Sequence, residues 1–198
     1  MNRAILLVGP SGAGKTSASL SIESQSDRYS ALSLDSLAAE YWSRKGLISL
    51  GDFQLLAQSL WPAMRLLAAG LEALRDYAAG HNGKSLIVEL APTFQDVPSA
   101  SDLWRTFEVV AITAAPEVAY RRYSGRTDDR LSAEEYIRRE FNVDRMRVYS
   151  SAQHQIDSTA KTMGQTAEEL AAVLRTIAAS TSESRDQVGW NPSWFAEL

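Results

Sequence analysis

Gly9-Pro10-Ser11-Gly12-Ala13-Gly14-Lys15-Thr16 completes the pattern G-x-x-x-x-G-K-[ST] near the start of the chain. The five apolar residues at 4–8 suit a strand buried on both faces, and residues 16–24 can continue as a helix. Glycines let the backbone of such a loop approach an anion, while successive N–H groups and the helix N-terminus supply partial positive charge. The pattern and its flanks therefore predict a loop that binds the phosphates of a nucleoside triphosphate.

The side chains of this loop have expected tasks. Lys15 is placed to reach the outer phosphates, and the Thr16 hydroxyl can coordinate magnesium. ATP and Mg2+ are the expected cofactors. The expected nucleotide-binding residues here are Gly9, Ser11, Gly12, Ala13, Gly14, Lys15, Thr16 and Ser17.

Length and composition narrow the classes of function. A chain of 198 residues with 45% hydrophobic content suits one compact domain. The net charge of −4 gives no overall attraction to nucleic acid, which favours small-molecule substrates. The chain has no cysteine, and its first apolar run is too short for a signal peptide or a membrane span. A cytoplasmic location is the default expectation.

Strand patterns at 4–8, 29–34, 85–90 and 108–113 predict four strands, and the weaker pattern at 154–159 predicts a fifth. Helical stretches lie between them, which predicts an α/β fold with a parallel sheet and a ligand crevice at the strand carboxyl ends.

Two further segments have distinct patterns. The segment 36–80 is too long for one crossover helix and is expected to form a helical insertion. Its apolar stripe, interpreted as core packing, is Leu60, Met64, Leu67, Leu71, Leu74 and Ala78. The domain is expected to span 1–179, and the aromatic residues of the tail at 180–198 are expected to dock on the body or on a neighbouring chain.

Arginines are dense after the fourth strand, at Arg121, Arg122, Arg126 and Arg130, with Arg138 and Arg139 on a helix expected to begin near Ser132. Phosphoryl transfer needs positive charge around the moving group and exclusion of water, which a mobile lid over 122–139 would supply. Arg122 and Arg126 would share a helix face if that helix extends far enough, and could clamp the phosphates together. The alternative is a solvated charged helix whose arginines pair with Glu134, Glu135 and Glu140.

The chain resembles the nucleoside and nucleotide kinase branch of P-loop proteins. Residues 9–15 are similar to the loop of guanylate kinases. Ala115-Pro116-Glu117, Arg122, Ser124-Gly125-Arg126 and Asp128-Asp129 are similar to the lid of short-lid adenylate and uridylate-cytidylate kinases, and Ile156-Asp157-Ser158-Thr159 resembles the strand that borders the adenine site. The resemblance spans most of residues 1–178. It implies a three-layer αβα kinase fold with sheet order 2-3-1-4-5, an acceptor-binding insertion and a short lid.

Two acids follow strands. Asp35 is the first candidate to orient an acceptor hydroxyl and take its proton, in a position similar to the acid of shikimate and deoxynucleoside kinases. Glu89 resembles the acid that holds a magnesium-bound water, and the two roles could be exchanged. A helix N-cap is the alternative for Asp35, and a salt bridge to the lid for Glu89. The stretch 89–94 has no arginine to hold an acceptor phosphate, which favours a hydroxyl acceptor.

The expected site can now be stated by role. The expected catalytic residues are Lys15, Asp35, Arg122, Arg126 and Arg130, with Arg122 also contacting the nucleotide. The expected metal-binding residues are Thr16, Glu89 and Asp35, and the expected acceptor-binding residues are Asp35, Arg44 and Glu89.

The sequence thus predicts an ATP-dependent kinase that phosphorylates a hydroxyl or phosphate of a nucleoside, nucleotide or similar metabolite. One alternative is a kinase acting on a modified base in phage-type DNA. Another is a nucleotide switch ATPase that contacts a partner through its aromatic tail. Monomer and homodimer both stay open.

Overall fold

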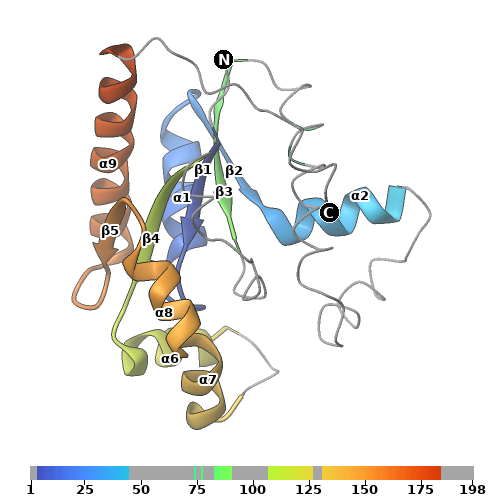
Figure 1. Cartoon of the computed structure of the whole chain (residues 1–198), viewed down its shortest axis with the longest axis vertical. Helices are drawn as coiled ribbons and strands as arrows, with labels where there is room; N and C mark the ends of the chain where they lie inside the picture. Colours follow the sequence, from blue (N-terminus) through green and yellow to red (C-terminus); the bar gives the residue numbers. More distant parts are fainter. Residues whose placement is uncertain are drawn as a thin grey trace.

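β1 (Ala4–Val8) is the central strand of a five-stranded sheet in the computed structural model of the chain (Figure 1). The structure describes residues 4–44, 74, 77, 83–90, 107–126 and 131–183, with the backbone alone at 35, 38, 41, 42 and 181–183. Four of the five β1 residues are buried, as expected for a strand covered on both faces.

The other strands are β2 (Tyr29–Ser33), β3 (Ser85–Glu89), β4 (Glu108–Thr113) and β5 (His154–Asp157). Their order is β2-β3-β1-β4-β5, and every neighbouring pair is parallel. This confirms the predicted order 2-3-1-4-5. The chain passes from β1 to β2 and β3 on one side of β1 and then crosses to β4 on the other side, so the crevice at the carboxyl end of β1 is where a ligand is expected.

Helices α1 (Lys15–Gln25) and α9 (Met163–Glu183) cover one face of the sheet and pack on each other (Figure 1). Ile5 and Leu7 of β1 lie in one buried cluster with Ile22 of α1 and with Leu170 and Leu174 of α9. Alternate strand residues therefore face this layer.

The opposite face has its own buried cluster. Leu6 and Val8 contribute from β1, Leu34 from α2 (Leu34–Arg44) and Tyr149 from α8 (Val143–Ser150). Leu74 joins this cluster and is fully buried, in agreement with core packing at that position of the insertion. Helices on both faces confirm the predicted three-layer α/β fold.

Helices α6 (Pro116–Ser124) and α7 (Ala133–Glu140) gather with α8 at one end of the molecule (Figure 1). The start of α7 is fixed by a capping box, in which Ser132 Oγ accepts from the Glu135 N–H and Glu135 Oε2 accepts from the Ser132 N–H. This confirms the helix expected near Ser132. α6 follows directly from β4, so this group extends the carboxyl-end side of the sheet.

Several boundaries differ from the prediction by one or two residues. β2 ends at Ser33 because Leu34 already starts α2 and turns its side chain into the core. β5 ends at Asp157, and the hydroxyl of the next residue, Ser158, bonds Ala13 O of the phosphate loop and Thr113 O at the end of β4. The predicted boundary at 179/180 falls inside α9, which runs to Glu183.

Of the predicted insertion at 36–80, residues 45–73, 75, 76 and 78–80 lie outside the described residues, as do residues 184–198 of the predicted tail at 180–198. None of the helices in the described ranges combines the length and the apolar character that a membrane span needs.

Candidate active site

A cavity of about 290 Å³ lies where β1, β2 and β3 end. Its size is near the lower limit for small-molecule sites, about 300 Å³. The phosphate loop, the ends of β2 and β3, and the end of α6 contribute its lining residues, which are Ser11, Gly12, Gly14, Lys15, Thr16, Ser33, Glu89, Leu90, Tyr123 and Arg126.

Two glycines of the phosphate loop that line the cavity have left-handed backbone. Gly12 has φ 84° and Gly14 has φ 98°. A Cβ atom added at Gly12 would lie 2.2 Å from the Ala119 carbonyl oxygen of α6, whereas a Cβ at Gly14 would meet nothing within 4 Å. Gly12 thus allows the loop to pack closely on α6, and Gly14 leaves room at the N-terminus of α1.

Several carbonyl oxygens of this loop accept hydrogen bonds from the protein itself. The Lys15 ammonium donates to Gly9 O at 2.7 Å and to Pro10 O at 3.1 Å, and the Ala13 N–H also donates to Pro10 O. Carbonyl oxygens repel a bound anion, so this bonding suits a loop that presents N–H groups to phosphate.

The acid at the end of β3 is bonded to α1. Thr16 Oγ1 donates to Glu89 Oε2 at 2.7 Å, and Ser19 Oγ donates to Glu89 Oε1 at 2.6 Å. Ser19 is fully buried. The two hydroxyls lie one helical turn apart, and together they fix both carboxylate oxygens at the cavity wall.

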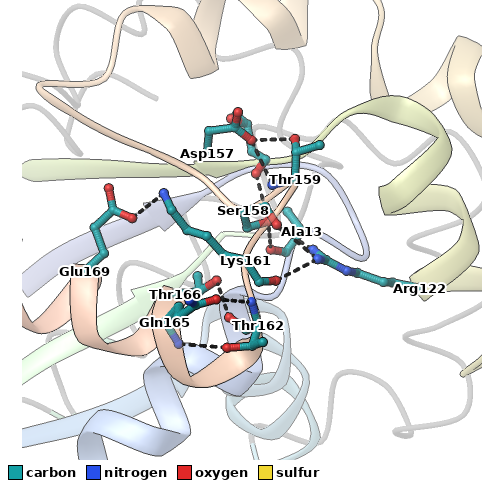
Figure 2. Close-up of polar contacts among 11 residues, drawn as sticks. Ala13, Arg122, Asp157, Ser158, Thr159, Lys161, Thr162, Gln165, Thr166 and Glu169 are labelled. Atoms are coloured by element: carbon teal, nitrogen blue, oxygen red, sulfur yellow. Dashed lines mark hydrogen bonds and ion pairs between the residues drawn. The ribbon is translucent and has the colours of Figure 1, made fainter.

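Arg122 lies in a network beyond β5, which Figure 2 shows. Its guanidinium donates to Ser158 Oγ at 3.1 Å, to Ser158 O at 3.0 Å and to Lys161 O at 3.2 Å. The Ser158 hydroxyl also lies 2.8 Å from Ala13 O in the phosphate loop. Arg122 therefore ties α6 to the loop after β5, and this loop to the phosphate loop.

Asp157 and Thr159 are hydrogen-bonded to each other at the start of the loop after β5. Thr159 donates to Asp157 Oδ1 through both its hydroxyl and its N–H, and these bonds hold the pKa of Asp157 below its usual range. Lys161 forms an ion pair with Glu169 of α9 (Figure 2).

The predicted lid is described in part. Arg126 lines the cavity, but α6 ends at Ser124, so Arg122 and Arg126 do not share a helix face. Tyr123, between these arginines, also lines the cavity, and the Arg139 guanidinium lies 5.7 Å from the centroid of its ring. Arg130 lies outside the described residues.

The remaining candidates lie around the β2–α2 junction and in α1. Asp35 is the second residue of α2, and its side chain lies outside the description. Arg44 is 81% exposed at the end of α2, where it pairs with Glu40 at 3.3 Å. Ser17 is half-buried in the first turn of α1. The roles predicted for these three residues stay predictions.

The sequence matches the family described as chloramphenicol phosphotransferase-like protein over residues 2–175. The chain belongs to this family. It is a phosphotransferase with the P-loop kinase fold, which confirms the predicted class of enzyme and the predicted P-loop kinase resemblance.

Solved structures agree with this fold at low sequence identity. A protein from Thermus thermophilus has a TM-score of 0.65 at 20% identity, covering 89% of this chain and 98% of its own. Shikimate kinase from Bacteroides thetaiotaomicron has a TM-score of 0.59 at 19% identity, covering 87% and 98%. The tunicamycin resistance protein of Deinococcus radiodurans has a TM-score of 0.59 at 17% identity, covering 88% and 96%. A search of curated proteins gives no match to the sequence.

Several residues at or beside the cavity had no role predicted from the sequence. They are Ser19, Ser33, Leu90 and Tyr123. Tyr123 lies between Arg122 and Arg126, so the arginine-rich run could have pointed to it as a site residue. Ser33 lies two residues before Asp35, the predicted acceptor-binding acid, and could have been found in the same way. Ser19 belongs to no sequence motif. Its role is indicated only by its hydrogen bond to Glu89, which the fold creates.

Proposed function

We propose that this phosphotransferase transfers the γ-phosphoryl group of Mg-ATP to a hydroxyl group of a small metabolite. The observation that carries the proposal is the hydrogen bond between Thr16 Oγ1 and Glu89 Oε2 at the cavity wall. It brings together Thr16, predicted to bind magnesium, and the acid after β3, and P-loop enzymes that transfer phosphoryl groups hold magnesium with a hydroxyl and an acid in such positions.

The donor nucleotide would lie along the phosphate loop. The N–H groups of the loop and the Lys15 ammonium would hold its phosphates, with Arg126 above them. The loop after β5, which resembles an adenine-site border, is bonded to the phosphate loop through Ser158 and Ala13. This neighbourhood supports base binding next to that loop.

The residues present fit a magnesium ion that is bound together with ATP. Such ions keep several water molecules and take few ligands from the protein, the remainder being phosphate oxygens. Within the described ranges no three His, Cys, Asp or Glu side chains form a metal site, and Thr16 and Glu89 supply the oxygen atoms expected here. The ion supplies positive charge that stabilises the phosphates during transfer.

The acceptor would be held at the β2–α2 junction. Ser33 lines the cavity, and Asp35 follows two residues later in the first turn of α2. In this proposal Asp35 takes the hydroxyl proton as the acceptor oxygen bonds to phosphorus and the bond to the ADP leaving group breaks. Arg44 would bind a more distant polar group of the acceptor.

A hydroxyl acceptor is favoured over a phosphate acceptor on two grounds. Lys15 and Arg126, the cations among the described lining residues, are both needed by the donor phosphates, and residues 89–94 contain no arginine. The family is named for phosphorylation of chloramphenicol, and one structural neighbour is a shikimate kinase. Both compounds carry hydroxyl groups and belong in a first acceptor panel.

The test is ADP release from Mg-ATP across chloramphenicol, shikimate, nucleosides, nucleoside monophosphates and hydroxymethylated DNA. Lys15→Ala is the control, because it removes charge at the phosphates. We expect one hydroxyl compound to stimulate release by at least tenfold in the wild type and not in the control. Stimulation by monophosphates alone would contradict the hydroxyl assignment. Tight ATP binding with turnover only in the presence of a protein partner would favour the nucleotide switch.

A further inference from the structure

Ser11 of the phosphate loop is bonded on both sides of its backbone by side chains of α7. The Ser11 N–H donates to Glu140 Oε2 at 3.0 Å, and Tyr136 Oη donates to Ser11 O. These partners lie more than 120 positions away in the sequence. The bonds fix the orientation of one residue in the wall of the cavity.

Tyr136 and Glu140 are four residues apart, so they project from the same face of α7. Both side chains are 0% exposed. The Tyr136 ring packs against Tyr120, Tyr123 and Phe141, with centroid distances of 5.3, 5.1 and 6.0 Å. Burial and the nearby Glu140 carboxylate raise the pKa of Tyr136 well above its usual range, so its phenol stays a donor.

Two arginines neutralise the buried Glu140 carboxylate. Arg139 Nε donates to Glu140 Oε1 at 2.9 Å, and Arg145 Nη1 lies 3.1 Å from the same oxygen. The Arg145 side chain is 7% exposed, whereas the Arg139 side chain is 43% exposed and reaches Tyr123 at the cavity. Glu140 thus contacts the phosphate loop on one side and a cation beside the cavity on the other.

These contacts complete a pattern in the loop. The carbonyl oxygens of Gly9 and Pro10 accept from Lys15, that of Ser11 from Tyr136 and that of Ala13 from Ser158. A loop that binds phosphate must keep these oxygens away from the anion, so that the N–H groups other than that of Ser11, which donates to Glu140, can face it. Tyr136 is the donor that α7 contributes to this arrangement.

We propose that Tyr136 and Glu140 are positioning residues that hold the phosphate loop in its nucleotide-binding shape. Both side chains come from α7, most of which lies within the predicted lid at 122–139. This deepens the proposed function, on which it rests, because it assigns to α7 control over affinity for the donor phosphates. Neither residue is required to touch the nucleotide.

The test compares Tyr136→Phe with Tyr120→Phe. Both variants keep their ring and lose one hydroxyl in the same aromatic cluster, but Tyr120 Oη donates to Leu131 O and not to the phosphate loop. We expect Tyr136→Phe to raise the Kd for Mg-ADP and the KM for ATP about tenfold, with kcat changed less than threefold. Tyr120→Phe should bind ADP as the wild type does.

Glu140→Gln provides a second variant of matched size. It keeps an oxygen that can accept from Ser11 but loses the charge that holds Arg139 and Arg145, and we expect a similar or larger rise in the Kd for Mg-ADP. Equal ADP affinity in Tyr136→Phe and the wild type would overturn the proposal, as would an equal loss in Tyr120→Phe. Because ADP binding needs no acceptor, this result is independent of whether the acceptor panel finds a substrate.

Discussion

At the level of single residues, the acid after β3 depends on a serine that belongs to no motif. Ser19 is buried and bonds one Glu89 oxygen, while Thr16 bonds the other. Partners of this kind orient a metal-binding group, and losing one typically costs 10–100-fold in metal affinity. We expect Ser19→Ala to raise the Mg2+ concentration for half-maximal activity about tenfold.

The measurement is initial rate against free Mg2+ at saturating ATP. Ser24→Ala is the matched control, because Ser24 lies on the same helix, is exposed, and its hydroxyl donates to Ser21 O within that helix. An unchanged Mg2+ dependence in Ser19→Ala would rule out the positioning role.

Glu140 illustrates which residue roles the sequence can and cannot predict. The sequence predicted a helix that begins near Ser132, and the capping box that fixes this start joins Ser132 and Glu135, which are only three residues apart. For Glu140, local spacing indicated only an alternative in which it pairs with nearby arginines on a solvated helix. Its actual surroundings include Ser11, 129 positions away, and no local pattern encodes a contact that only the tertiary fold creates.

At the level of elements, the sequence predicted all five strands, most directly β1, β3 and β4, which are apolar runs bounded by polar or turn residues. β5 has one apolar residue, Ile156, and its pattern was weaker. It did not predict the end of α6 or the separate helix α8. The end of α6 matters for the site, because Arg122 stays on the helix and bonds the loop after β5 while Arg126 reaches the cavity. Arginines from one run therefore lie at two different sites, the loop after β5 and the cavity.

The contact between the phosphate loop and α6 gives a prediction about stability. Gly12→Ala and Gly14→Ala both place a side chain at positive φ, which costs about 1–3 kcal/mol in each case. Only at Gly12 does the new Cβ also collide with backbone, 2.2 Å from Ala119 O. Gly12→Ala should therefore lower the free energy of unfolding clearly more than Gly14→Ala in urea denaturation without nucleotide. Equal losses would mean that loop and helix can separate at little cost.

At the level of the whole molecule, the candidate nucleotide site joins parts that lie far apart in the chain. The phosphate loop follows β1, while its neighbours Tyr136, Glu140 and Ser158 come from α7 and from the segment after β5. A ligand that contacts the loop therefore stabilises packing among elements far apart in sequence. Binding to the folded state alone should appear as a rise in melting temperature.

Mg-ADP at about 100 times its Kd should add about 2.7 kcal/mol to the stability of the fold, which corresponds to a rise in Tm of roughly 5–10 °C for a chain of this size. Lys15→Ala should lose most of this rise, because the ammonium that would meet the phosphates is gone. Arg147→Ala is the control, since Arg147 is 79% exposed on α8 and its removal changes the net charge equally. A rise that is the same in all three proteins would place the ADP elsewhere on the molecule. A rise lost only in Lys15→Ala would tie it to the loop whose geometry α7 and the segment after β5 maintain.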